Sequence, residues 1–150
     1  MGIFDSPLKI VLDTNVILSS LSKRSPYRII IDKLLDVQYE IFVTTEILLE
    51  YDEKISIFFD PITAQLFLDS FEVLPNVHYA NIYYKFLLIT HDADDDKFAD
   101  CAIASGVHFL VTDDKHFKVL LKKGFPRVSL MKIKDFAELL KDLKKFKNDK

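Results

Sequence analysis

The stretch HDADDDKFADCAIASGVHFLVTDD, residues 91–114, holds seven aspartates around a segment with the pattern of a helix followed by a buried strand. Like charges repel, so crowded carboxylates raise each other's pKa unless a cation lies among them. Oxygen ligands suit a hard divalent cation, Mg²⁺ or Mn²⁺. The four histidines are scattered and the chain has one cysteine, which argues against zinc. The stretch therefore predicts a site for one or two divalent cations.

Carboxylates also stand where predicted strands end. Asp13 directly follows the apolar run KIVL, and Asp113 and Asp114 come just after the run HFLV. In parallel α/β sheets, ligands bind beyond the carboxyl ends of the strands, where the strand order reverses. If these two strands are neighbours, the side chains of Asp13 and Asp114 share one crevice.

Predicted helices contribute further acids. Glu50 lies one turn into the helix after the second strand, and Asp96 and Asp100 are four residues apart on one face of a later helix. Metal ions held by such acids can generate a hydroxide and clamp the attacking and leaving oxygens of a phosphodiester, with no side-chain nucleophile. We therefore predict a metal-dependent hydrolase with these catalytic acids: Asp13, Glu50, Asp96 and Asp114.

The acids must be positioned by alternating strands and helices. Four-residue apolar runs predict strands at 9–12, 40–43, 71–74, 108–111 and 128–131. Helices are expected from Asn15, from Ser25–Pro26, after Thr44, from Pro61, over YANIYYKFLLI, before Gly106, before Gly124 and from about Lys134. Short strands that are apolar throughout indicate a parallel sheet covered on both faces, and right-handed crossovers then give a three-layer α/β/α sandwich.

Length and composition indicate one domain. The 150 residues are 49% hydrophobic, and no repeat or linker divides them. Cys101 is the only cysteine, so an internal disulfide is impossible and a reducing compartment is expected. No apolar run approaches the roughly 20 residues that span a bilayer, and the N-terminus lacks the signal-peptide pattern. We expect a cytoplasmic protein with no membrane partner.

Charge is divided along the chain. Residues 1–114 carry 8 Lys and Arg against 19 Asp and Glu, whereas residues 115–150 carry 12 against 4. An acidic centre beside a basic segment suits a protein that handles a polyanion such as RNA. The alternative is that the lysines only solvate exposed helices. The expected RNA-binding residues are Lys23, Arg24, Lys122 and Lys123.

Taken together, the motifs resemble a PIN domain of the VapC-like toxin class. They are IVLDTNVILSSL, then TTEILLEYDEKI with Glu50, then DADDDKFADCAIASGVHFLVTDDKHF. The resemblance covers residues 9–136, with a basic helix or tail at 137–150. It implies a five-stranded parallel sheet in the order 3-2-1-4-5 and metal-dependent cleavage of RNA. It further implies the toxin of a toxin–antitoxin pair, with a protein antitoxin and a homodimer as possible partners.

The resemblance also implies roles for single residues. Asp13 matches the first metal ligand, Asn15 an amide that braces the site, and Glu50 the helical acid. Asp114 in VTDD matches the last acid, and Thr112 is the hydroxyl that precedes it.

The third acid is open between neighbouring aspartates. Counting back from Gly106 favours Asp95, whereas counting back from Thr112 favours Asp96. Asp100 stands where relatives have an acid or a small apolar residue. Helical spacing favours Asp96 with Asp100.

Two other protein classes fit the sequence less well, and one class without catalytic activity is an alternative. A haloacid-dehalogenase-type phosphatase needs a second acid two residues after the first, where Asn15 stands. A receiver domain needs an aspartate after the third strand, and FEVLPN supplies none. A catalytically silent PIN-like module that binds RNA or acts as a scaffold remains the alternative to a nuclease.

Overall fold

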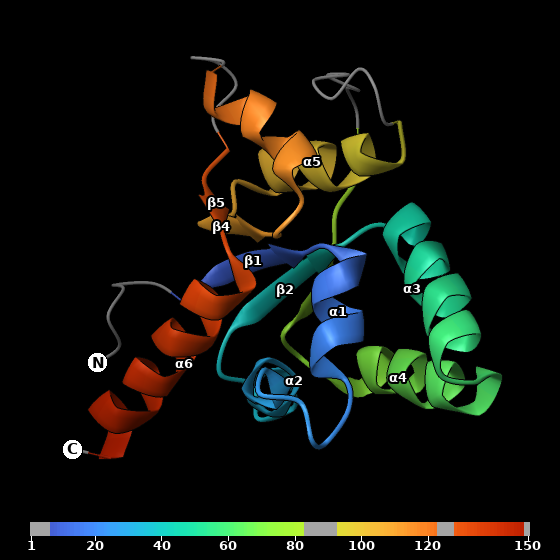
Figure 1. Cartoon of the computed structure of the whole chain (residues 1–150), viewed down its shortest axis with the longest axis vertical. Helices are drawn as coiled ribbons and strands as arrows, with labels where there is room; N and C mark the ends of the chain where they lie inside the picture. Colours follow the sequence, from blue (N-terminus) through green and yellow to red (C-terminus); the bar gives the residue numbers. More distant parts are fainter. Residues whose placement is uncertain (1–6, 83–92, 123–127, 149–150) are drawn as a thin grey trace.

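The chain folds around one parallel sheet (Figure 1). The computed structural model describes residues 7–82, 93–122 and 128–148. Within these ranges, residues 93–96, 119–122 and 144–148 are described by their backbone alone. The five strands are β1 (Lys9–Leu12), β2 (Glu40–Val43), β3 (Val77–Tyr79), β4 (Phe109–Val111) and β5 (Leu130–Met131). All pairings are parallel and the order is β3-β2-β1-β4-β5, which confirms the expected fold and strand order.

Helices connect the strands. They are α1 (Thr14–Ser20), α2 (Arg28–Leu35), α3 (Thr45–Phe58), α4 (Pro61–Val73), α5 (Ala93–Ser105), the 3-10 helix η1 (Lys115–Lys122) and α6 (Ile133–Asn148). Helix α5 packs against β1, β2 and β4, while α1 packs against α2 and α3, and α2 against α6. In Figure 1, α5 lies above the central strands and α1, α2 and α6 lie below them, as a three-layer sandwich requires.

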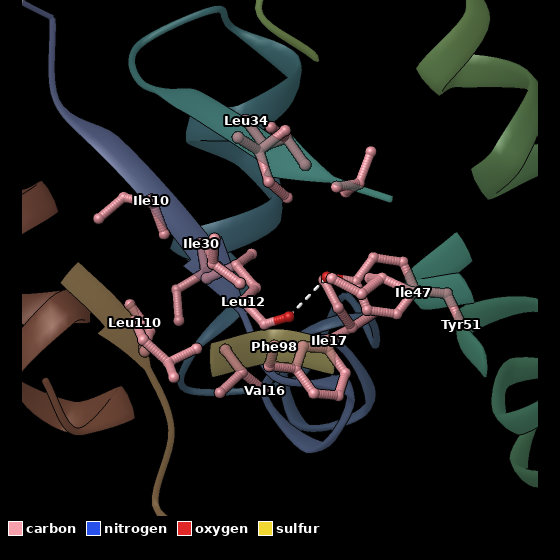
Figure 2. Packing of buried hydrophobic residues seen from close by; sticks show 14 of the residues in the cluster. Ile10, Leu12, Val16, Ile17, Ile30, Leu34, Ile47, Tyr51, Phe98 and Leu110 are labelled. Atoms are coloured by element: carbon pink, nitrogen blue, oxygen red, sulfur yellow. Dashed lines mark hydrogen bonds between the residues drawn. The ribbon is translucent and has the colours of Figure 1, made fainter. Parts of the chain in front are cut away.

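The central strand β1 is apolar after its first residue because both of its faces are covered. Ile10, Val11 and Leu12 of β1 are all 0% exposed. Figure 2 shows Ile17 of α1 and Phe98 of α5 packed close to Leu12. Each such side chain stabilises the fold by about 1.5–3 kcal/mol through burial. The sheet is therefore a rigid base for the residues at its carboxyl edge.

The third strand was predicted at the wrong place. The residues 71–74, FEVL, belong to the end of α4 and the residue after it, and the strand is Val77–Tyr79. Phe67 and Phe71 are one helical turn apart, both are buried, and their rings lie 4.8 Å apart. Their packing continues α4 for one turn beyond the expected end.

Other element boundaries differ by smaller amounts. Helix α2 begins at Arg28 rather than at Pro26, because the Ser25 hydroxyl accepts a hydrogen bond from the Tyr27 amide in a turn before the helix. The expected Thr44 cap, Pro61 start and Gly106 stop are all present, with Gly106 at a φ of +61°. Most of the helix expected over YANIYYKFLLI lies outside the described residues. Over the part of the chain that the structure describes, no helix is both long and apolar enough to cross a bilayer.

Candidate functional site

The sheet brings two acidic segments to one place. Strands β1 and β4 pair with Leu12 opposite Val111, and the Asp13 amide donates to the Val111 carbonyl at 3.1 Å. Asp13 and the segment Thr112–Asp114 therefore leave the sheet side by side at its carboxyl edge. The strand order reverses between β1 and β4, and ligands of such folds bind at the carboxyl edge of the sheet at this switch point.

Asp13 is buried and held by a neighbouring strand end. Its side chain is 4% exposed, and the Thr112 hydroxyl donates to its Oδ2 at 2.7 Å. The same hydroxyl accepts a hydrogen bond from the Asp114 amide at 3.0 Å. Asp13 is the N-cap residue of α1, but its side chain makes no capping hydrogen bond to the second or third amide of the helix, and the Thr14 backbone beside it favours the charged carboxylate. The position of the carboxylate is therefore set by Thr112 of the neighbouring strand end.

The second carboxylate comes from α3. Glu50 accepts a hydrogen bond at Oε2 from the Thr14 hydroxyl, and its Oε1 lies 2.8 Å from Lys97 Nζ of α5. The next residue, Tyr51, is fully buried and donates from its hydroxyl to the Leu12 carbonyl at 2.5 Å (Figure 2). Helix α3 is therefore bonded to the end of β1, one residue before Asp13.

These acids act on each other electrostatically. Burial raises the pKa of the Asp13 carboxyl from 3.8 to about 6. The hydrogen bond from Thr112 opposes this rise, and the negative charges of Asp114 and Glu50 add to it. A cation placed among the three carboxylates would relieve both the burial cost and the repulsion.

Asp114 borders a pocket. The pocket has a volume of about 220 Å³ and is lined by Asn15, Val16, Ser19, Asp113, Asp114 and Ile133. The half-buried Asp114 also accepts a hydrogen bond from the His116 amide at 2.9 Å. Asn15 is exposed and faces this pocket, so its expected bracing role stays a prediction. Asp113 has a different task, because its Oδ1 accepts a hydrogen bond from the Ile133 amide and so caps α6.

The candidates for the third acid lie on α5. Asp100 is buried, with 5% exposure, while Asp95 and Asp96 lie in the first turn of α5, where the structure describes only the backbone. The choice between Asp95 and Asp96 therefore stays open. Among the side chains that the structure describes, no three of His, Cys, Asp or Glu lie close enough together to hold a metal ion. The donors around Asp13 are nevertheless all oxygens, which fits a hard cation.

Two contributors were missed by sequence reasoning. Thr14 lies inside the motif DTN, and its hydroxyl holds Glu50 rather than a neighbour in sequence. Lys97 is the one cation within the aspartate-rich run DDDKFAD, which was the available signal. Their importance depends on the distance from α1 and α5 to α3, which local sequence does not give.

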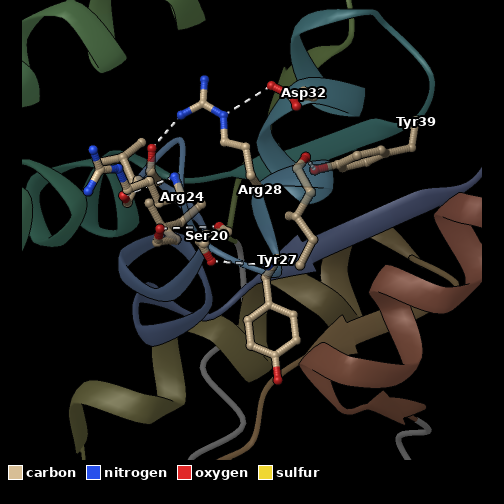
Figure 3. Close-up of polar contacts among 11 residues, drawn as sticks. Ser20, Arg24, Tyr27, Arg28, Asp32 and Tyr39 are labelled. Carbon is tan, nitrogen blue, oxygen red and sulfur yellow. Dashed lines mark hydrogen bonds and ion pairs between the residues drawn. The ribbon is translucent and has the colours of Figure 1, made fainter.

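Of the expected basic residues, the structure describes the side chains of Lys23 and Arg24, and these two lie away from the carboxylates. Lys23 and Arg24 are exposed in the turn after α1, at the end of that helix opposite to Asp13. Arg28 fixes this turn by donating to the Leu21 carbonyl and to Asp32, at 3.0 Å from the latter (Figure 3). Lys122 ends η1 with its side chain outside the description, and Lys123 lies outside the described residues.

Fold and site together define a parallel α/β protein with an acidic centre at the switch point of its sheet. The sequence model of the PIN domain family matches residues 9–116. The chain therefore belongs to the PIN domain family, whose fold is that of nucleases that generally use divalent metal ions.

Solved structures share the fold at low sequence identity. VapBC2 from Rickettsia felis, bound to a DNA fragment from its promoter, matches with a TM-score of 0.57 and 22% identity over 83% of this chain and 98% of that one. FitAcB from Neisseria gonorrhoeae matches with a TM-score of 0.52 and 18% identity over 83% and 97%. The T. brucei RRP44 PIN domain matches with a TM-score of 0.52 and 10% identity over 96% of this chain and 87% of that one. No curated protein matches the chain.

Proposed function

We propose that the chain is an Mg²⁺- or Mn²⁺-dependent endoribonuclease. The observation that carries this proposal is the buried Asp13, whose pKa is raised to about 6 next to Asp114 and Glu50 at the carboxyl edge of β1 and β4. Membership of a nuclease family supports the same conclusion. The proposed ligands are Asp13, Glu50 and Asp114, with Asp95, Asp96 or Asp100 of α5; the described acids do not yet form a cluster of three, so the ion would have to draw them together.

Protein side chains would orient the carboxylates, and the bound ion would activate the water. Thr112 orients Asp13, and Thr14 and Lys97 orient Glu50, so each carboxylate has a defined direction before the ion binds. The bound ion would supply an activated water and offset charge on the phosphate. The carboxylates set where the ion stands, and the pocket beside Asp114 leaves room for substrate at this edge.

The substrate would be RNA, bound through its phosphates. A crevice this acidic repels a polyanion, so attraction must come from basic residues elsewhere on the surface. Lys122 and Lys123, close in sequence to the β4 end, are the stronger candidates, since Lys23 and Arg24 lie at the far end of α1. Contacts of this kind set affinity without reading base sequence.

A protein antitoxin is the partner we propose. VapBC2 and FitAcB, which share the fold, are themselves complexes of two kinds of chain. Helices α3 and α4 pack together and offer an apolar surface to such a partner or to a second copy of the chain. Its exposed side chains are Leu49, Ile57, Phe58, Ile62, Leu66 and Val73. The test is to ask whether the product of the adjacent gene co-purifies with this chain and blocks its activity.

Purified protein and a labelled RNA test the nuclease activity directly. We expect cleavage with Mg²⁺ or Mn²⁺, loss of cleavage in excess chelator, and loss in an Asp13→Asn variant that remains folded. Asp36→Asn, at an exposed position after α2, is the matched control and should cleave normally. Full activity in excess chelator, or in Asp13→Asn, would disprove the mechanism.

One observation favours the alternative of a catalytically silent PIN-like module. Both oxygens of Glu50 are already held by protein donors, as in a site that needs no metal. Such a module would bind RNA and leave it intact at every Mg²⁺ and Mn²⁺ concentration. A phosphatase-like hydrolase would instead release phosphate from a small phosphomonoester, which we do not expect.

A further inference from the structure

Lys97 and Glu50 form an ion pair that is largely removed from water. Lys97 Nζ lies 2.8 Å from Glu50 Oε1, and the two side chains are 12% and 18% exposed. The ammonium also lies 5.3 Å from the centroid of the Phe98 ring. Taking two charges out of water is costly, and a buried ion pair often adds no net stability compared with apolar residues of the same volume. Stability alone is therefore a poor reason for a lysine at this position.

The pair is part of the acidic site. Glu50 is the helical carboxylate whose charge raises the pKa of Asp13, and its other oxygen is held by Thr14, the residue after Asp13. Lys97 lies on α5, the helix that carries the candidate third acid. The ammonium thus places one positive charge where carboxylates from β1 and α3 converge.

We propose that Lys97 is the resident counter-ion of the site: it neutralises Glu50 in the metal-free protein and is displaced from Oε1 when a divalent ion binds. This proposal rests on the proposed metal-dependent function. Lys97 is then a positioning residue that competes with the ion. It keeps the Glu50 carboxylate aimed at the site, and it sets the ion concentration above which the site fills.

Two measurable effects follow from electrostatics. A unit charge within several ångströms of a divalent cation repels it strongly in a partly buried site. Removing the charge of Lys97 should therefore tighten ion binding. The same change leaves the Glu50 carboxylate buried without this partner, so the metal-free protein should become less stable.

The experiment uses the full chain and Mn²⁺ alone, without RNA. Lys97→Met removes the charge and keeps most of the stem, while Lys97→Arg keeps the charge. Lys141→Met is the matched control, because Lys141 pairs with Glu138 at 3.5 Å on an exposed face of α6. The readouts are the Mn²⁺ dissociation constant by titration calorimetry and the melting temperature with Mn²⁺ and with chelator.

We expect Lys97→Met to bind Mn²⁺ roughly tenfold more tightly than the original chain. Its melting temperature in chelator should fall by several degrees, and Mn²⁺ should restore it. Lys97→Arg and Lys141→Met should resemble the original chain. Mn²⁺ binding that is unchanged or weaker in Lys97→Met would overturn the proposal, since Lys97 would then help to hold the ion or play no part.

A double variant covers the case in which Lys97→Met does not fold. Glu50→Gln combined with Lys97→Met has neither charge of the pair, and it should melt in chelator near the temperature of the original chain. A double variant that is no better folded than Lys97→Met would overturn the pairing. If neither the original chain nor Lys97→Met binds Mn²⁺, the proposed metal-dependent function fails as well. If both proteins bind Mn²⁺ with the same affinity, the counter-ion role alone fails.

Discussion

The ionised form of the Asp13 carboxyl is disfavoured by its surroundings. Its carboxyl is buried next to two other acids, and its pKa of about 6 lies above the ordinary 3.8. Keeping this group ionised at neutral pH costs the metal-free fold about 3 kcal/mol, because each pKa unit corresponds to about 1.4 kcal/mol. Such a cost is reasonable only if a bound cation uses the charge.

The pH dependence of stability tests this cost. The folded protein binds the Asp13 proton more tightly than the unfolded chain does, so stability should fall as the pH rises from about 4 to about 6 and stay low above that. Asp13→Asn should remove this part of the fall and raise the melting temperature at pH 7. The measurement is thermal unfolding in chelator between pH 4 and 7.5. Parallel curves for the variant and the original chain would contradict the assignment.

At this scale, the sequence suggests candidate acids but not the residues that hold them. Because strand ends converge in a parallel sheet, Asp13 was expected beside the segment that follows β4, and the Thr112 hydroxyl of that segment donates to Asp13 Oδ2 at 2.7 Å. The partners of Glu50 could not be predicted, because they come from α1 and α5. Such contacts depend on how helices pack, which short motifs do not specify.

Among the elements, α3 positions the site through one hydrogen bond. The Tyr51 hydroxyl bonds to the Leu12 carbonyl at 2.5 Å, which fixes α3 against β1 next to both Glu50 and Asp13. The ring also packs against Phe67 and Phe71 of α4. This contact connects the apolar core with the acidic edge of the sheet.

Tyr51→Phe should therefore affect both stability and ion binding. We expect a loss of roughly 1–2 kcal/mol in the free energy of unfolding, from one buried hydrogen bond, and weaker Mn²⁺ binding because Glu50 is less fixed. Tyr39→Phe is a matched control, since the buried Tyr39 hydroxyl donates to the Ile30 carbonyl at 2.7 Å away from the site. Denaturant unfolding and Mn²⁺ titration of both variants measure the two effects. Equal Mn²⁺ binding in the two would refute the role of Tyr51.

Strand prediction succeeded where a strand is a buried apolar run and failed where it is not. The buried runs of β1 and β2 were placed correctly, residue for residue. Strand β3 was missed because two of its three residues, His78 and Tyr79, are polar or aromatic and partly exposed, so it lacks the apolar run that marks the other strands. His78 is held there by stacking on Phe42 and by Glu40, contacts made across the sheet.

At the scale of the whole molecule, charge is separated along the chain. The acids gather before residue 115 and the bases after it, with 12 Lys and Arg against 4 Asp and Glu in the last segment. The acidic edge of the sheet cannot attract RNA by itself, so binding and chemistry should depend on different residues.

Replacing Lys122 and Lys123 with Gln should separate RNA binding from RNA cleavage. We expect weaker RNA binding and a shallower dependence of affinity on salt, because fewer phosphate contacts release fewer counterions. Mn²⁺ binding and the rate of cleavage of saturating RNA should be nearly unchanged. Binding assays at several salt concentrations provide the measurement. The same affinity and salt slope in the double variant would show that these lysines only solvate the surface.

The position of a bound ion tests the central claim most directly. Crystals soaked in Mn²⁺ and measured at its absorption edge should show an anomalous difference peak at the carboxyl edge of β1 and β4. We expect that peak between Asp13 and Asp114, with an acid of α5 beside it, and we expect none there in Asp13→Asn. Crystals at saturating Mn²⁺ with no peak next to Asp13, or with the same peak in Asp13→Asn, would contradict a metal-dependent site at these residues.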